Sequence, residues 1–131
     1  MTTLVDANVL LDIATEDARW FDWSAQALAT AAGAGHVAIN PLIYAEVAAG
    51  FSRVEDLNAA LADFQRLPLP YDAGFLAARC FVRYRRAGGQ RRSPLPDFSI
   101  GAHAAVEGLT LLTRDAARYR TYFPRLALIV P

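Results

Sequence analysis

The sequence predicts an α/β fold, a three-layer α/β/α arrangement in which a short, mostly parallel central sheet is flanked by helices. Two observations lead to this prediction. Short apolar runs typical of buried strands alternate with stretches of helical periodicity, and turn residues separate them. Such alternation favours parallel strands with helices on both faces. The length of 131 residues and the 54% hydrophobic content suit one domain over residues 1–131.

The expected strands are short. The first is a buried apolar run that ends at Asp6. The run Leu67-Pro68-Leu69-Pro70 is too rich in proline for a central strand, so we expect it at an edge of the sheet. The expected strands cover residues 3–6, 36–39, 67–70, 110–113 and 126–130.

Capping and stop signals bound the expected helices. Asn40 followed by Pro41 is typical of an N-cap with proline at the first helical position, and that helix stops at Gly50. Glycines end three others, at 33–35, 88–89 and 108. The expected helices are a turn over residues 9–13 and then residues 20–32, 41–49, 55–65, 72–87, 96–107 and 116–122.

The charge balance excludes a protein that holds nucleic acid by net charge alone, because thirteen basic and thirteen acidic side chains cancel. Every basic residue is arginine and lysine is absent. This looks like a compositional bias, so one arginine at a given position is weak evidence for bidentate recognition.

We expect a cytoplasmic protein. Cys80 is the only cysteine, which excludes an intrachain disulfide and fits a reducing compartment. The N-terminus lacks the basic and apolar regions of a signal peptide, and no apolar run approaches the roughly 18 residues of a membrane-spanning helix.

Four acidic residues stand where a carboxylate is unexpected on a plain surface: Asp6, Glu46, Asp97 and Asp115. Asp6 and Asp115 follow expected strands, and ligands of such sheets bind beyond the carboxyl ends of the strands. Asp97 begins a helix, and Glu46 lies within an apolar stretch. If the fold brings them together, the repelling carboxylates are stable mainly around a divalent cation. The sequence therefore predicts a metal-dependent enzyme.

Each acid also has a purely structural interpretation. Asp6 can cap the following helix, Asp97 can answer a helix dipole and Asp115 can form an Asx-turn. Glu46 can pair with an arginine, because a buried carboxylate without a partner is costly.

Four blocks in order, residues 5–12, 44–47, 96–103 and 112–115, resemble the motif blocks of PIN-domain ribonucleases, and most of all the VapC-type toxins of bacterial toxin–antitoxin pairs. The resemblance implies a PIN-like fold and a Mg²⁺- or Mn²⁺-dependent endoribonuclease that acts on RNA. It also implies a homodimer and a cognate antitoxin that blocks the site. The implied metal ligands are Asp6, Glu46, Asp97 and Asp115, with Asn8 and Thr113 as polar neighbours.

This chemistry suits those residues. Cleaving a phosphodiester with water requires a stronger nucleophile than neutral water and neutralisation of charge on the phosphate oxygens. Magnesium held by carboxylates supplies both, so no histidine base is needed.

A basic segment precedes Asp97. Arg83 and Arg86 share a helix face, and Arg91 and Arg92 lie in the loop that follows. The cluster is interpreted either as a solvated surface or as a site that binds RNA phosphates or an acidic antitoxin tail.

Aromatic residues and histidines favour structural roles. Trp20, Phe21 and Trp23 suit a core or dimer contact better than base stacking. His36 and His103 suit a surface or satisfied core role better than a catalytic one.

Other classes fit less well. Haloacid-dehalogenase-like phosphatases and response-regulator receiver domains use a lysine that this chain lacks. The alternative from another class is a catalytically inactive PIN-like domain that binds RNA or an antitoxin, and the intact acids in all four blocks argue against it.

Overall fold

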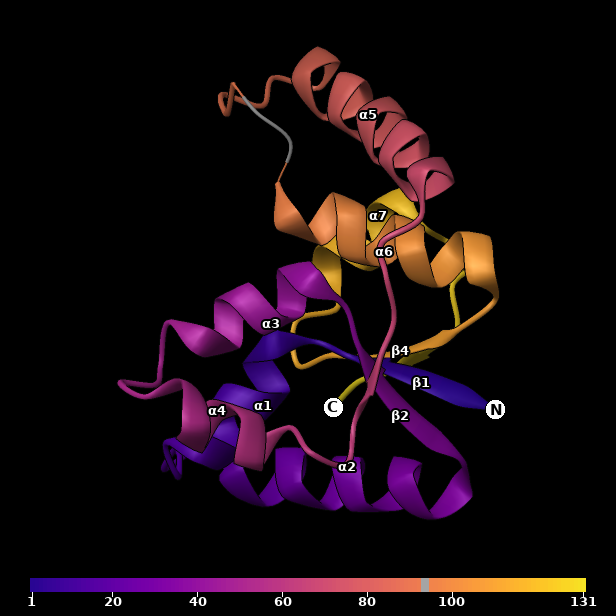
Figure 1. The fold of residues 1–131 in the computed structure, drawn as a ribbon. Helices are drawn as coiled ribbons and strands as arrows, with labels where there is room; N and C mark the ends of the chain where they lie inside the picture. The colour runs from indigo at the N-terminus through magenta and orange to yellow at the C-terminus, as the bar shows by residue number, and fades with distance from the viewer. Residues whose placement is uncertain (93–94) are drawn as a thin grey trace.

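The computed structural model describes residues 1–92 and 95–131. Its centre is a parallel sheet of five strands (Figure 1). Its order is β3-β2-β1-β4-β5, and all four pairings are parallel. The strands are β1 (Thr2–Val5), β2 (His36–Ile39), β3 (Gln65–Arg66), β4 (Thr110–Leu112) and β5 (Leu128–Ile129). The predicted fold class is confirmed.

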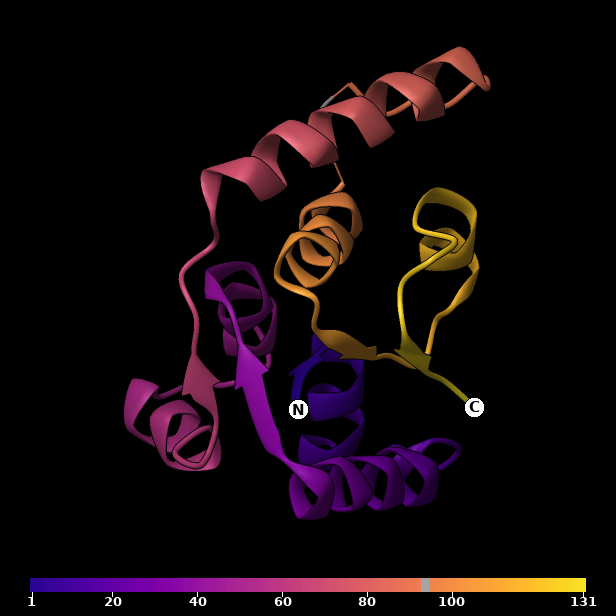
Figure 2. The same cartoon turned by 90° about the vertical axis from the view of Figure 1, so that its right-hand side faces the viewer.

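Helices cover both faces of the sheet. Helices α1 and α2 lie against one face and α6 and α7 against the other, while α5 lies outside α6 (Figures 1 and 2). The helices are α1 (Ala7–Ala14), α2 (Phe21–Ala34), α3 (Pro41–Ala48), α4 (Val54–Ala60), α5 (Tyr71–Arg86), α6 (Pro96–Glu107) and α7 (Ala117–Tyr122). Within the described ranges, no helix is long and apolar enough to cross a membrane.

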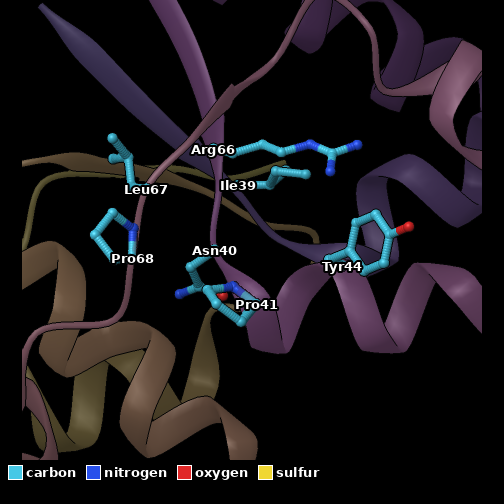
Figure 3. Close-up of a pocket in the computed structure, with 7 residues that line it drawn as sticks. All are labelled: Ile39, Asn40, Pro41, Tyr44, Arg66, Leu67 and Pro68. Atoms are coloured by element: carbon cyan, nitrogen blue, oxygen red, sulfur yellow. The ribbon is translucent and has the colours of Figure 1, made fainter.

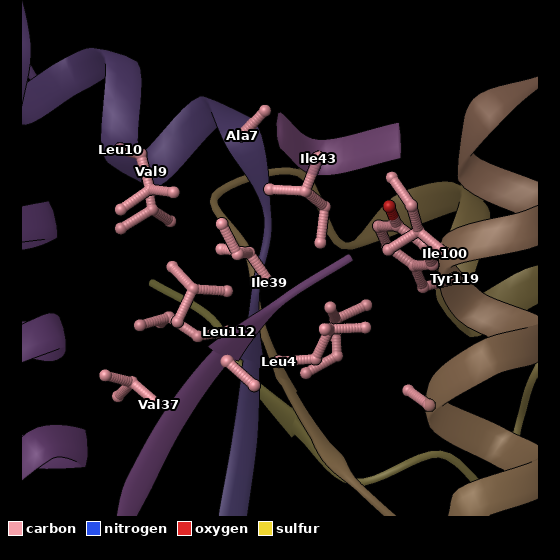
Figure 4. Close-up of a cluster of buried hydrophobic side chains, with 14 of the residues drawn as sticks. Leu4, Ala7, Val9, Leu10, Val37, Ile39, Ile43, Ile100, Leu112 and Tyr119 are labelled. Atoms are coloured by element: carbon pink, nitrogen blue, oxygen red, sulfur yellow. The ribbon is translucent and has the colours of Figure 1, made fainter. Parts of the chain in front are cut away.

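The core lies on both sides of the central strand. Leu4 and Val5 are adjacent in β1 and both fully buried, which explains why this strand is a continuous apolar run. Figure 4 shows the side chains around it, with Val9 and Leu10 of α1 on one side and Ile100 of α6 on the other.

The expected end of the second helix is wrong. Helix α2 continues through Gly33 to Ala34, because this glycine is exposed with open space around it and its alanine neighbours favour a helix. The end falls at Gly35, where a Cβ atom would collide with the Met1 carbonyl oxygen.

The expected helix over 55–65 and the strand over 67–70 also need correction. Helix α4 ends at Ala60 and the edge strand is Gln65–Arg66. Prolines at 68 and 70 carry no N–H group, so the last bond to β2 is donated by Leu67 N to Ile39 O at 2.9 Å. The edge position was predicted correctly, but the residues were not.

The order of the strands sets the position of the site. From β1 the chain proceeds to β2 and β3 on one side, and later to β4 and β5 on the other. The carboxyl ends of β1 and β4 therefore flank the switch point of the sheet, where a crevice opens. Asp6 N donates to Leu112 O at 2.9 Å, which joins the two strand ends.

Candidate active site

Asp6 lies at the carboxyl end of β1 and is 5% exposed. Its Oδ1 accepts a hydrogen bond from Ala7 N at 2.8 Å, so it caps α1 as the structural interpretation expected. Its Oδ2 accepts from Thr113 Oγ1 and from the Tyr119 hydroxyl, each at 2.9 Å. Burial raises the pKa of this carboxyl, the two hydroxyl bonds lower it, and the charge of Asp97 raises it, with a net rise.

Asn8 and Thr113 connect α1 to the turn after β4. Asn8 Nδ2 donates to Thr113 Oγ1 at 3.2 Å, and Asn8 Oδ1 accepts from Arg114 N at 3.1 Å. The amide of Asp115 also donates to Thr113 Oγ1, at 3.2 Å. Both predicted neighbours therefore lie beside Asp6, Thr113 in direct contact and Asn8 through Thr113.

Glu46 projects from α3 and is half-buried. Its Oε1 is buried and has no hydrogen-bond partner among the described residues, and no arginine pairs with it there. Burial is the largest cause that raises the pKa of Glu46 to about 7, and the charges of Asp6 and Asp97 add to it. The carboxyl group thus lies within electrostatic reach of two other carboxylates, and its buried Oε1 has no partner among the described residues to offset their charge.

Asp97 lies in the first turn of α6 and is partly exposed. Its Oδ1 is 3.5 Å from the Tyr119 hydroxyl, and its Oδ2 is 3.9 Å from Arg118 Nε. Burial raises its pKa, Arg118 lowers it and Asp115 raises it, with a net rise.

Asp115 is exposed in the turn after β4, and its charge reaches Asp97. Asp6, Glu46 and Asp97 influence one another, whereas Asp115 lies at the edge of the group beside Asp97. The structure thus brings three of the predicted acids together and places the fourth next to one of them.

The sequence interpretation missed Tyr119 and Arg118. Tyr119 is 1% exposed and its hydroxyl lies between Asp6 and Asp97. The one signal in the sequence is that the expected helix of Tyr119 follows the fourth acidic block, because burial of its hydroxyl depends on how that helix packs.

A second network holds the turn after β4. The guanidinium of Arg114 donates to both carboxylate oxygens of Asp12, at 2.8 and 2.9 Å, and Ser24 Oγ donates to the same carboxylate at 2.8 Å. The hydrogen bond to Asp12 is the main cause that raises the pKa of Arg114. Arg114 also lies 5.4 Å from the Trp20 ring centroid, so Trp20 has a packing role here.

The predicted basic cluster lies on the outer layer. Arg83, Arg86, Arg91 and Arg92 are all exposed. Arg83 makes a cation–π contact with Tyr122, at 5.3 Å from the ring centroid. Arg91 N donates to the Tyr84 hydroxyl at 3.4 Å, which fixes the start of the loop toward Asp97.

His103 is a satisfied core histidine, as predicted. It is fully buried, with Nδ1 3.0 Å from Asn40 Nδ2 and Nε2 3.1 Å from Glu107 Oε2. Asn40 also lines a mainly apolar pocket of about 390 Å³ between β2, β3 and α3 (Figure 3). None of the four acids lines this pocket, so it is separate from the acidic group.

The acidic group offers carboxylate oxygens, the donor type that hard divalent cations prefer. In the described part of the chain no three Asp, Glu, His or Cys side chains are already arranged around one ion position. In this conformation Tyr119 and Thr113 bind Asp6, and Arg118 approaches Asp97. The partnerless Glu46 Oε1 beside two carboxylates is nevertheless an oxygen that a hard cation would satisfy.

Fold and site define a class of α/β proteins with carboxylates gathered at the switch point of a parallel sheet. Comparison with known families then identifies the family: the chain belongs to the PIN domain family, whose sequence profile matches residues 3–124. The predicted resemblance is confirmed. No curated protein matches the sequence significantly.

Solved structures of toxin–antitoxin complexes share this fold. A chain of the toxin–antitoxin complex from Klebsiella pneumoniae superposes with a TM-score of 0.70 at 23% identity, over 97% of this chain and 95% of that one. A chain of VapBC2 from Rickettsia felis, bound to a DNA fragment from its promoter, has a TM-score of 0.72 at 17% identity, over 100% of this chain and 99% of that one. A chain of VapBC-1 from nontypeable Haemophilus influenzae has a TM-score of 0.75 at 13% identity, over 99% of this chain and 98% of that one.

Proposed function

We propose that this chain is a Mg²⁺- or Mn²⁺-dependent endoribonuclease, the toxin of a type II toxin–antitoxin pair, which cleaves RNA phosphodiester bonds with a metal-activated water. The observation that carries the proposal is the uncompensated carboxyl group of Glu46 beside Asp6 and Asp97 at the switch point of the sheet. Membership of the PIN domain family and the likeness to toxin–antitoxin complexes support it.

In this proposal Asp6, Glu46 and Asp97 hold the cation, and Asp115 completes the set from the rim. When bound, the cation supplies positive charge that activates water and neutralises the phosphate oxygens. Thr113 and Tyr119 fix the orientation of the Asp6 carboxylate, and Asn8 fixes Thr113. The exposed Arg83, Arg86, Arg91 and Arg92 provide positive charge for the RNA backbone or for the antitoxin.

The partners follow from the same proposal. We propose a homodimer that acts on cytoplasmic RNA and is blocked by a cognate antitoxin. Antitoxin binding is proposed because the similar solved structures are toxin–antitoxin complexes.

Cleavage of a panel of RNAs tests the proposal. We expect magnesium-dependent cleavage that chelator abolishes and that Asp6→Asn lowers by about a hundredfold or more, the scale of several kcal/mol of transition-state stabilisation. Asp63→Asn, at an exposed aspartate, is the matched control and should cleave like the wild type. RNA binding without cleavage would instead favour the inactive binding module.

A further inference from the structure

A cleft of about 350 Å³ begins at Asp115 and continues between α5 and α7. The residues that line it are Tyr84, Asp115, Ala117, Arg118, Thr121 and Tyr122. It therefore adjoins the acidic group at the side where Asp97 and Asp115 lie.

Two tyrosines in the cleft wall are anchored on one core residue. The ring centroid of Phe98 is 5.7 Å from that of Tyr84 and 4.9 Å from that of Tyr122, both in edge-on geometry. Phe98 is fully buried, whereas both tyrosines are half-buried. Phe81 stacks on Tyr84 with 6.2 Å between the ring centroids, and Arg118 and Arg83 lie over Tyr84 and Tyr122. A base can stack on either ring once the arginine above it moves aside toward the phosphate of the same nucleotide.

Two arginines bring positive charge to the same rings. Arg118 lies 5.6 Å from the Tyr84 centroid and Arg83 lies 5.3 Å from the Tyr122 centroid. Arg118 Nη1 is buried without a hydrogen-bond partner among the described residues, and its Nε is 3.9 Å from Asp97. The Arg118 side chain is 36% exposed, so its guanidinium can turn toward an anionic oxygen in the cleft, where Nη1 would gain the partner that it lacks while buried.

We propose that this cleft binds one unpaired nucleotide of single-stranded RNA next to the scissile phosphate. The base stacks against Tyr84 and Tyr122, and Arg118 and Arg83 bind its phosphate. Stacking on side chains requires a base that is free of its duplex, so the nucleotide in the cleft is unpaired. The inference rests on the proposed function and locates the substrate relative to the acidic group.

A nucleotide explains the composition of the cleft better than an acidic protein tail does. It presents a flat ring and an anion in one unit, which matches paired aromatic and arginine side chains. Asp115 in the same wall disfavours a run of acidic side chains, whereas a nucleotide brings a single phosphate that the arginines can meet.

Binding of RNA oligonucleotides, measured by fluorescence anisotropy in chelator and in an Asp6→Asn background that slows cleavage, tests the inference. Tyr122→Leu and Arg118→Gln should each weaken binding of a single-stranded RNA by about fivefold or more, the scale of losing one stacked base. Tyr122→Trp should retain binding. Tyr71→Leu and Arg125→Gln are matched controls at exposed positions outside the cleft and should bind like the parent.

A second measurement protects the test against a folding defect, since Tyr122 packs on Phe98. Oligonucleotides with 5-iodouracil beside the cleavage position should cross-link on irradiation of the otherwise unmodified protein to the peptides that contain Tyr84 or Tyr122. Cross-links elsewhere, unchanged binding by both cleft variants, or no binding of RNA would overturn the inference. Unchanged RNA binding by both cleft variants would favour a protein partner as the occupant of the cleft.

The outcomes for the two proposals are distinct. Magnesium-dependent cleavage together with unaffected cleft variants would retain the nuclease and reject the subsite. Cross-linking to the tyrosines without cleavage by the wild type would support the subsite and reject the nuclease.

Discussion

Glu46 carries the clearest electrostatic signature of the site, because its folded-state pKa is about 7 against an ordinary value of 4.5. A folded state with a raised carboxyl pKa binds the proton more tightly than the unfolded chain does. This contribution to stability is therefore fully present below about pH 4.5 and is lost as the pH rises through about 7. Asp6 and Asp97 are shifted in the same direction.

We predict that the free energy of unfolding of the metal-free protein falls between about pH 5 and about pH 8, and that Glu46→Gln flattens this fall. Urea denaturation in chelator at both pH values measures it. Glu55→Gln, at an exposed glutamate, is the matched control and should keep the wild-type dependence. A Glu46→Gln protein with the same pH dependence as wild type would show that this carboxyl is not strained.

At the scale of elements, the turn after β4 depends on α1 and α2. Arg114 in the turn binds both oxygens of Asp12 in α1, and Ser24 in α2 binds the same carboxylate. The turn also carries Thr113 and Asp115, so this clamp positions one side of the site.

Asp12→Asn should lower the free energy of unfolding by about 2 kcal/mol, because a buried charge-assisted pair is lost. Cleavage should fall as well, since the turn is no longer fixed. Denaturant midpoints measure the first effect, and Asp22→Asn, at an exposed position of α2, serves as control. Equal denaturant midpoints for Asp12→Asn and Asp22→Asn would show that Asn8 and Thr113 hold the turn without help from Asp12.

Helix α5 offers a graded test of its arginines. Arg83 approaches the cleft through Tyr122, whereas Arg86 is exposed near the end of the helix. If both meet RNA phosphates, each alanine variant should reduce the slope of log binding constant against log salt by about one. Arg53→Ala, an exposed arginine of another element, should leave the slope unchanged. Unchanged slopes for Arg83→Ala and Arg86→Ala would show that these arginines form a solvated surface and do not bind RNA phosphates.

At the scale of the whole molecule, the sequence predicted the fold class and most elements because local signals agree with the packing. The expected helix over 96–107 and the Asn40-Pro41 cap are found as predicted, with Ile43 N bonded to Asn40 Oδ1. The edge strand was misplaced because β3 has only two residues, Gln65 and Arg66, which are too few for an alternating pattern. The neighbouring run with prolines at 68 and 70 was assigned as the strand instead.

The gathering of the acids was predictable from strand ends, but their individual environments were not. The placement of Tyr119 between Asp6 and Asp97 depends on how α7 packs against α6, which no local pattern encodes. The same holds for Arg118, whose contacts with Tyr84 and Phe98 depend on how the last three helices pack together.

The melting temperature of wild type and Asp97→Asn, with chelator and with magnesium, tests the central claim most directly. In chelator at neutral pH the variant should melt higher, because an amide removes one of the repelling charges. Magnesium should stabilise the wild type by about 2.7 kcal/mol at a hundredfold excess over its dissociation constant, and the variant far less. Equal magnesium-induced shifts in the two proteins would contradict a metal site that includes Asp97.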